Sequence, residues 1–274
     1  MQTKMDSPER FRKVWKGGYY EGNPMEPMST STYGICGFNS ILYTVYLTCI
    51  RPYVNFNTTA LEIGPGRGAW TKAMLQHEAK KIFVVDAAPP EHTGFWDYVG
   101  KTDRVEYCTV SDLTLAPVPD SSIDFFFCFG VFCHLSPESS EAYISALARK
   151  MKPGADGFLM VADYDKFNRC IDNVDRVSLK AFLGSHPAKI WLPTRLAFNA
   201  TWTLFKNRMV SRHISKQDDM EGTATKPVDR WYHLGVDRAC EIIEKEGFTI
   251  VERDMEVVPR DPVIHFRKPL AGEA

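Results

Sequence analysis

The sequence has almost no net charge and no closely spaced pair of cysteines. Its 33 Lys and Arg residues against 34 Asp and Glu leave a formal charge of -1, so no global field attracts nucleic acid or an anionic membrane, and any such preference is local. The seven cysteines form no C-x-x-C pair. Several lie in apolar runs, as Cys128 does in 125–129, which is typical of small buried side chains in a reducing compartment and makes a structural zinc site unexpected.

Long apolar runs and internal repeats are also missing. The stretch from Met1 to Arg12 is polar and charged, unlike a secretory signal, and the most apolar helical stretch, Ser40 to Val54, is too short and polar to span a bilayer. The sequence therefore favours a cytoplasmic protein with no membrane span. A chain of 274 residues is long enough to bury a sizeable core as one large domain, or as one domain with an added segment.

What the sequence does contain is a glycine-rich turn between an apolar strand and a helix. Residues 60–63 predict a short buried strand, glycines at 64, 66 and 68 a tight turn, and Ala69 onward a helix. Glycine allows positive φ and a close approach of a ligand to the backbone, and a helix start favours an anionic group. The spacing differs from the dinucleotide fingerprint G-x-G-x-x-G, and no G-x-x-x-x-G-K-[ST] run exists, so both nucleotide-binding motifs are disfavoured.

Acidic residues lie at or just after the ends of the first three predicted strands. The second strand, 81–85, ends in Asp86, an acid placed to accept hydrogen bonds from ribose hydroxyls. With Glu62 before the glycines and Asp112 after the third strand, the chain resembles the class I S-adenosylmethionine (SAM)-dependent methyltransferases, whose first motif is E/D-x-G-x-G-x-G. The resemblance implies SAM as cofactor, S-adenosylhomocysteine as product, and cofactor contacts from Glu62, Gly64, Pro65, Gly66, Gly68, Asp86, Ala87, Ser111, Asp112, Phe129 and Gly130.

The order of the elements predicts an α/β fold. Strands alternate with helices up to residue 162, which indicates a doubly wound, Rossmann-like parallel sheet. We expect one amphipathic helix over 38–53, and a helix over 138–151 that is ended by Lys152-Pro153-Gly154, a turn common in the resembled family. In that family the sheet has seven strands, mostly parallel, with an antiparallel last strand. Four parts are expected: an N-terminal lid and helix (1–55), a SAM-binding core (56–165), a basic insertion after strand five that caps the substrate (166–229), and a C-terminal helix and strand hairpin that completes the core (230–274).

The residues expected to contact the substrate come from two unusual stretches. The first 34 residues are rich in aromatics and glycines and cannot form a core of their own, so we expect them to lie over another surface. Between Lys166 and Lys216 there are ten basic residues and two acids, which suits an anionic substrate, although a charge run is more often a solvated surface. The predicted substrate contacts are Tyr19, Tyr20, Tyr33 and Tyr164. The first three tyrosines have an equal alternative, packing at the domain edge.

Methyl transfer from a sulfonium depends on positioning and on exclusion of water, and an oxygen nucleophile also needs its proton removed. Active sites of open α/β sheets lie beyond the carboxyl ends of the strands, which selects His134 after strand four and Asp163 after strand five as candidate bases. His134 has an alternative role, as a residue at a helix start that only bonds backbone. Three more histidines satisfy the same rule if the insertion brings them near: His186, His213 and His233. Asp163 and Asp165 are an alternative pair of metal ligands, but no further ligands are evident, so no metal is expected.

The acceptor is the least determined feature of the sequence. Residues 15–22, 162–168 and 260–269 look like bacterial methyltransferases of sugar and surface-polysaccharide modification, so we expect a small-molecule O-methyltransferase acting on a sugar hydroxyl, with a phosphate-linked sugar suiting the basic insertion. One alternative is an RNA methyltransferase using 166–216, against which the near-zero charge and the lack of an appended RNA-binding motif argue. Another is a non-catalytic SAM-binding module, against which the intact acids and glycines argue. Nothing in the sequence sets the oligomeric state.

Overall fold

The computed structural model describes residues 22–26, 40–175, 232–270 and 272. Several of the predicted substrate and histidine positions fall outside these described residues: Tyr19, Tyr20, Tyr33, His186 and His213. So does most of the basic insertion, from 176 to 229. The structure therefore bears on the core, the start of the insertion and the C-terminal part.

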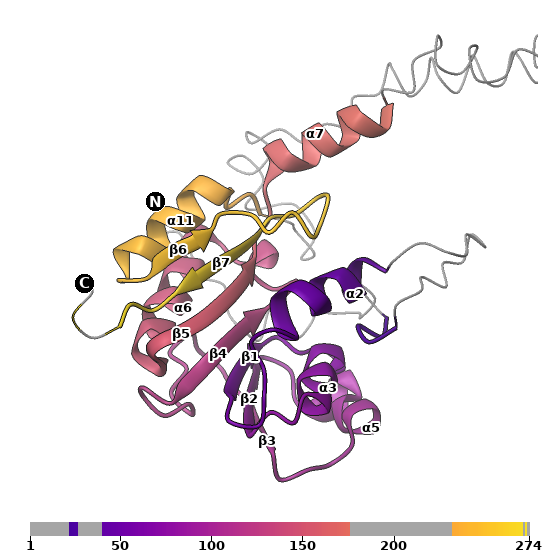
Figure 1. The fold of residues 1–274 in the computed structure, drawn as a ribbon, viewed down its shortest axis with the longest axis vertical. Coiled ribbons are helices and arrows are strands. Elements are labelled where there is room, and N and C mark those ends of the chain that lie inside the picture. The colour runs from indigo at the N-terminus through magenta and orange to yellow at the C-terminus, as the bar shows by residue number, and fades with distance from the viewer. Residues whose placement is uncertain (1–21, 27–39, 176–231, 271, 273–274) are drawn as a thin grey trace, which may run out of the picture.

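A seven-stranded sheet lies at the centre of the molecule, in the order β3-β2-β1-β4-β5-β7-β6 (Figure 1). The first five strands are parallel, and β7 pairs antiparallel with both β5 and β6. The strands are β1 (Thr59–Ile63), β2 (Lys81–Asp86), β3 (Val105–Thr109), β4 (Ile123–Cys128), β5 (Met151–Met160), β6 (Thr249–Glu252) and β7 (Val263–Arg267). The predicted doubly wound sheet with an antiparallel last strand is confirmed.

Helices cover both faces of this sheet. In Figure 1, α2, α3 and α5 lie against one face and α6 and α11 against the other, while α7 extends away from the sheet. The helices are α2 (Ile41–Val45), the π-helical turn η1 (Tyr46–Ile50), α3 (Ala69–Gln76), α4 (Pro90–Thr93), α5 (Phe95–Val99), the 3-10 turn η2 (Phe132–His134), α6 (Pro137–Lys150), α7 (Tyr164–Asp175) and α11 (Val236–Lys245). In the described part of the chain no helix is long and apolar enough to cross a bilayer.

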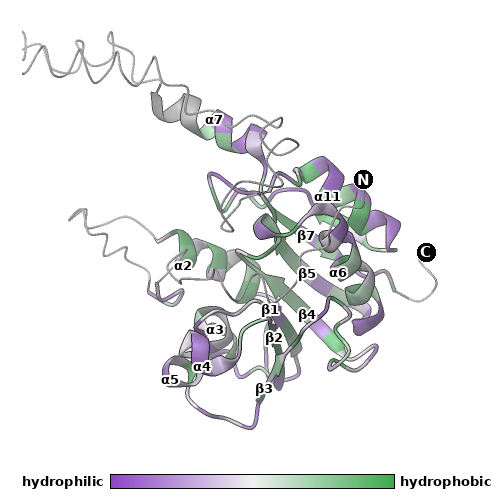
Figure 2. Ribbon diagram, turned by 180° about the vertical axis from the view of Figure 1, so that it is seen from behind, coloured by the Kyte–Doolittle hydropathy of each residue, from purple (hydrophilic) through white to green (hydrophobic). Residues whose placement is uncertain are grey.

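The core is divided into two layers by the alternation of side chains along the strands. On β4, Phe126 and Cys128 enter the layer beneath α6 and α11, whereas Phe125 and Phe127 enter the layer beneath η1 and α3. Because both faces are buried, the central strands are apolar throughout, and Figure 2 shows them in green between helices with mixed colours. Glu62 on β1 is an exception, since its carboxyl is buried and hydrogen-bonded to α3.

Two predicted boundaries differ from the structure. Of the expected helix over 38–53, residues 40–53 are described, and the helical part consists of α2 and a π-helical turn that ends at Ile50. The Lys152-Pro153-Gly154 turn lies inside β5, which begins at Met151. The pairing jumps there, because two steps along β4 (Ile123 to Phe125) correspond to five along β5 (Met151 to Asp156). The extra residues form a bulge in which Gly154 has φ of +81° and donates to Lys268 O at 2.7 Å.

The segments before and after the insertion meet at one place, at the end of β5. After β5 it enters α7, and it returns to begin α11 beside the same place. There the backbone N–H of Gly235 donates to Ala162 O at 3.0 Å. The two ends of the insertion are therefore adjacent at the carboxyl end of β5, the edge where open α/β sheets bind their ligands.

Candidate functional site

The glycine loop joins the carboxyl end of β1 to α3, and its backbone needs residues without a Cβ. Gly64, Gly66 and Gly68 have φ of +67°, +55° and +93°, the left-handed region that glycine adopts at little cost. A Cβ on Gly64 would lie 2.2 Å from Val131 Cγ2, and one on Gly68 would lie 2.3 Å from Val99 Cγ2. The turn thus requires glycine for two reasons: its positive φ angles, and its close packing against Val131 after β4 and against Val99 at the end of α5.

Glu62 is a buried carboxyl just before this loop, and within the described residues only one of its two oxygens is hydrogen-bonded. Its relative exposure is 1%. Thr71 on α3 donates from its hydroxyl to Oε2 at 2.5 Å, whereas Oε1 has no hydrogen-bond partner among the described residues. Burial raises the pKa of Glu62 to about 8; the Thr71 bond lowers it and the charge of Asp86 raises it further. A buried acceptor without a partner is costly, which marks this oxygen as a position for a ligand donor.

Asp86 ends β2 on the same edge of the sheet. Its Oδ1 accepts from the backbone N–H of Ala88 at 2.8 Å. Burial raises the pKa of Asp86 to about 6, although hydrogen bonds from backbone N–H groups, among them that of Gly66, and the charge of His92 lower it. Ala87 follows it in the chain, half-buried. The second predicted acid is therefore in contact with the glycine loop, and both acids lie where β1 and β2 end.

The loops after β3 and β4 complete this edge. Ser111 and Asp112 are exposed, and Asp112 Oδ1 accepts from the backbone N–H of Thr114 at 2.9 Å and from its hydroxyl at 2.7 Å. These bonds lower the pKa of Asp112, so it stays ionised at neutral pH. After β4, the Phe129 ring is stacked 6.2 Å from Phe127. Gly130, with φ of +82°, turns the chain toward η2.

His134 ends η2, half-buried, directly beyond the Phe129-Gly130 turn. The segment returning from the insertion lies against η2, since the backbone N–H of Tyr232 donates to Cys133 O at 2.7 Å. The next residue, His233, accepts at Nδ1 from the backbone N–H of Tyr164 at 3.0 Å, and the two rings are 4.9 Å apart. The structure thus places His134, buried Tyr164 and His233 in elements joined at one edge of the sheet.

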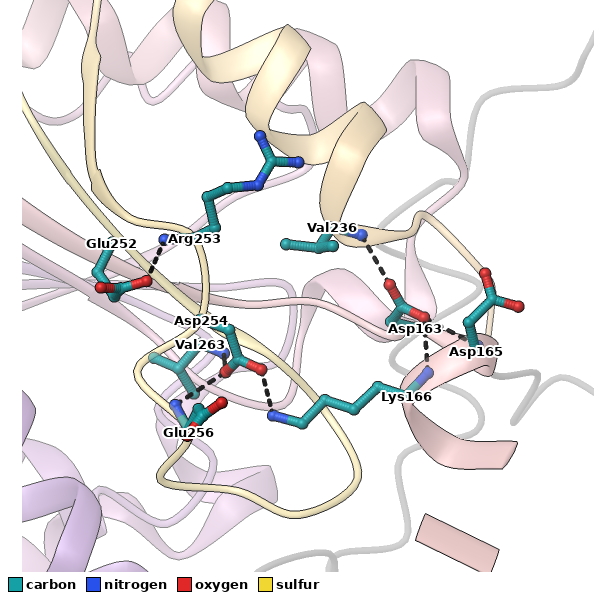
Figure 3. A network of polar contacts seen from close by, with 9 residues as sticks. All are labelled: Asp163, Asp165, Lys166, Val236, Glu252, Arg253, Asp254, Glu256 and Val263. Carbon is teal, nitrogen blue, oxygen red and sulfur yellow. Dashed lines mark hydrogen bonds and ion pairs between the residues drawn. The ribbon is translucent and has the colours of Figure 1, made fainter. Parts of the chain in front are cut away.

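Asp163 holds the starts of two helices (Figure 3). Its Oδ1 accepts from the backbone N–H groups of Asp165 and Lys166 at 2.8 and 2.9 Å, in the first turn of α7. Its Oδ2 accepts from that of Val236 at 3.0 Å, where α11 begins. Burial alone would raise the pKa of Asp163, but these bonds and the charge of His233 hold it below its ordinary value. A carboxylate bonded in this way is a weak base, and the geometry favours a structural role.

Figure 3 also shows how the start of α7 is tied to the C-terminal part. Lys166 Nζ lies 2.5 Å from Asp254 Oδ2, and both side chains are largely buried. Asp254 Oδ1 in turn accepts from the backbone N–H groups of Glu256 and Val263 at 3.0 and 3.3 Å. No group of three or more His, Cys, Asp or Glu side chains within the described residues has the arrangement of a metal site.

Two residues at the glycine loop were not singled out from the sequence. Thr71 is fully buried beside Glu62. It could have been found from the sequence as a polar residue on the inner face of the helix that follows the loop. Arg67 stands between two of the glycines and donates to Gly22 O at 3.0 Å, while its guanidinium lies 4.6 Å from the Tyr98 ring centroid. This contact joins the described part of the N-terminal segment to the loop, and no local sequence pattern indicates it.

Comparisons with known proteins agree with this geometry. Residues 61–159 match a family profile described as a methyltransferase domain. A SAM-dependent methyltransferase structure from Aquifex aeolicus is similar at TM-score 0.51 and 15% identity, covering 97% of this chain and 100% of that one. One from Mesorhizobium loti is similar at TM-score 0.52 and 11% identity, covering 83% and 98%.

A third similar structure is the 1,6-didemethyltoxoflavin-N1-methyltransferase of Burkholderia thailandensis with bound 1,6-didemethyltoxoflavin and S-adenosylhomocysteine. Its TM-score is 0.50 at 14% identity, over 84% of this chain and 78% of that one. No curated protein sequence matches the chain. At these identities the structures establish the fold, and the matched profile covers the segment that carries the glycine loop and both buried acids.

Proposed function

We propose that this chain, whose residues 61–159 match the methyltransferase-domain profile, transfers a methyl group from SAM to a hydroxyl of a small molecule, such as a sugar or glycan precursor. The observation that carries the proposal is the buried Oε1 of Glu62, which has no hydrogen-bond partner in the described part of the chain and lies beside a glycine loop with positive φ. SAM is an amino acid joined to a nucleoside, so its site needs a hydrogen-bond acceptor for the ammonium group, a stretch of backbone that the ligand can approach closely, and an acceptor for the ribose hydroxyls.

The residues present fit that cofactor. Glu62 and the loop from Gly64 to Gly68 would hold the amino-acid part, and Asp86 with Ala87 the ribose hydroxyls. Ser111 and Asp112 would lie beside the adenine base, and Phe129 and Gly130 would line the site after β4. When bound, SAM supplies an activated methyl on a sulfonium, so the chain's own task is to align the acceptor and exclude water.

For the acceptor proton we propose His134, which is half-buried at the sheet edge, because histidine is the side chain that most often serves as a general base. Asp163 is assigned to positioning, since both of its oxygens accept backbone hydrogen bonds. Tyr164 remains a proposed substrate contact, as do Tyr19, Tyr20 and Tyr33. A phosphate-linked sugar is supported by the sequence alone, through the basic residues between 166 and 216.

The cofactor part is tested by calorimetry with S-adenosylhomocysteine. Asp86→Ala should weaken binding by about tenfold or more, because hydrogen bonds to a charged acceptor contribute about 1.5–3 kcal/mol each. Asp97→Ala, an exposed acid on α5, is the matched control and should leave affinity unchanged. Unchanged affinity in Asp86→Ala, or no binding by the wild type, contradicts the proposal.

The acceptor part is tested by turnover of labelled SAM against nucleotide sugars, lipid-linked sugar phosphates, small amines and RNA. Methylation of a sugar hydroxyl that is lost in His134→Gln, with cofactor binding retained, supports the proposal. Transfer to an amine would move the chain to N-methylation, the chemistry that the Burkholderia enzyme's name describes. Transfer to RNA with affinity that falls steeply with salt would favour the alternative acceptor. Binding without any turnover would favour a non-catalytic module.

A further inference from the structure

At the proposed cofactor site the buried carboxyl of Glu62 accepts from the Thr71 hydroxyl with one oxygen, and its other oxygen, Oε1, has no partner among the residues that the structure describes. We propose that SAM and S-adenosylhomocysteine bind with release of a proton from Glu62, and that the carboxylate so formed becomes the counter-charge of the ligand's ammonium group. This inference rests on the proposed function and concerns the regulation of the same site by pH.

The surroundings of Glu62 keep it neutral before the ligand arrives. From α3 the Thr71 hydroxyl donates to it at 2.5 Å and favours ionisation, but burial outweighs this bond, and from β2 the charge of Asp86 opposes ionisation. The groups that it affects in turn are Tyr107 on β3 and Cys128 on β4, whose pKa values its charge raises. Within the part of the chain that the structure describes, no cation contributes to the pKa of Glu62. Burial and the local charges therefore both favour the protonated form.

A bound ammonium changes this balance because it brings a positive charge and N–H donors to Oε1. The O–H bond of the carboxylic acid breaks, the proton passes to solvent or buffer, and the ammonium keeps its own protons. With a pKa of about 8 in the free protein, Glu62 is about 90% protonated at pH 7. Binding at pH 7 should therefore release up to about 0.9 proton per site. Asp86, with a pKa of about 6, is mostly ionised at that pH and contributes little.

The proton count is measured by calorimetry at pH 7 in buffers that differ in ionisation enthalpy. We expect about 0.7–0.9 proton released with S-adenosylhomocysteine. The matched ligand is 5′-methylthioadenosine, which has the nucleoside and sulfur but no ammonium, and it should release almost none. Release below about 0.2 proton with S-adenosylhomocysteine, or equal release with both ligands, overturns the inference. Failure of S-adenosylhomocysteine to bind at all instead overturns the proposed function, so the two failures are distinguishable.

Two variants give an independent measurement through the pH dependence of affinity. The affinity of the wild type for S-adenosylhomocysteine, divided by that of Glu62→Gln, should rise about tenfold per pH unit from pH 6 and level off near pH 8. The ligand's own titration affects both proteins equally, so it cancels in this ratio. Thr71→Val removes the donor that favours the ionised form, so its levelling point should move to higher pH. A wild-type ratio that does not change with pH, or a Thr71→Val profile that moves to lower pH, contradicts the assignment of the proton to Glu62.

Discussion

Replacing Glu62 by Gln should change the stability of the cofactor-free protein in a pH-dependent way. The pKa of Glu62 rises from an ordinary value of 4.5 to about 8 in the folded protein. Between these values the folded protein holds a proton that the unfolded chain has released, so the free energy of unfolding falls as pH rises. This contribution is fully present below about pH 4.5 and is lost by about pH 8. Gln has the same shape and does not titrate.

The expected loss is about 1.4 kcal/mol per pH unit. Between pH 5.5 and 7.5 the free energy of unfolding of the wild type should therefore fall by about 2.7 kcal/mol relative to Glu62→Gln. The comparison uses the change with pH, so any constant cost of burying the amide cancels. Asp86, whose pKa is also raised, titrates in both proteins and largely cancels.

The assay is urea unfolding of both proteins without ligand, followed by circular dichroism at half-unit steps of pH. Equal slopes in urea at each pH would show that both unfold to comparable states. If the two stability profiles stay parallel from pH 5.5 to 8, Glu62 is ionised in the folded protein and the reasoning fails. A steeper fall for Glu62→Gln than for the wild type would fail it as well.

Two further substitutions test the site through stability. Gly68→Ala should destabilise by about 3 kcal/mol or more in urea unfolding, because its Cβ would meet Val99 at 2.3 Å. Gly94→Ala is the control, because Gly94 has the same left-handed conformation but a Cβ there would meet nothing closer than 4.0 Å, so it should cost about 1 kcal/mol. Equal costs would contradict the packing argument. Asp163→Ala should lower the free energy of unfolding by about 2–3 kcal/mol, because it removes the caps of two helices, and Asp163→Asn should cost about half of that. The control is Asp237→Ala, at an exposed position on α11, which should change stability by no more than about 0.5 kcal/mol. If Asp163→Ala costs no more than Asp237→Ala, Asp163 has no structural role.

The sheet and the glycine loop were predictable because their signals are local. A short apolar run, three closely spaced glycines and a helix follow one another within 59–76, and each of these patterns can be read from neighbouring residues. The parallel order then follows from the alternation of strands and helices, which places Glu62 and Asp86 at one edge without any knowledge of contacts.

What the sequence could not show depends on contacts between distant residues. Asp163 looks like a free acid after a strand, and its structural role appears only because Val236, 73 residues later, returns to its carboxylate. The Lys152-Pro153-Gly154 turn looks like a helix end, and the reason that it lies in a bulge of β5 is the pairing of Gly154 with Lys268 on the C-terminal segment. The protonation of Glu62 is likewise set by burial, which no local pattern reports.

These features make the cofactor edge a place where the free protein is under-stabilised. Glu62 and Asp86 are both buried with raised pKa values, so each costs folding free energy when ionised, and the glycine loop is held in a conformation that few residues adopt. A ligand that brings an ammonium to one acid and hydroxyl donors to the other removes part of that cost. The ligand stabilises the folded protein by an amount that grows with the logarithm of the ligand concentration divided by Kd, so this stabilisation should be larger at pH 8 than at pH 6. The same carboxyl that weakens the empty fold would thus set the pH at which the cofactor is held.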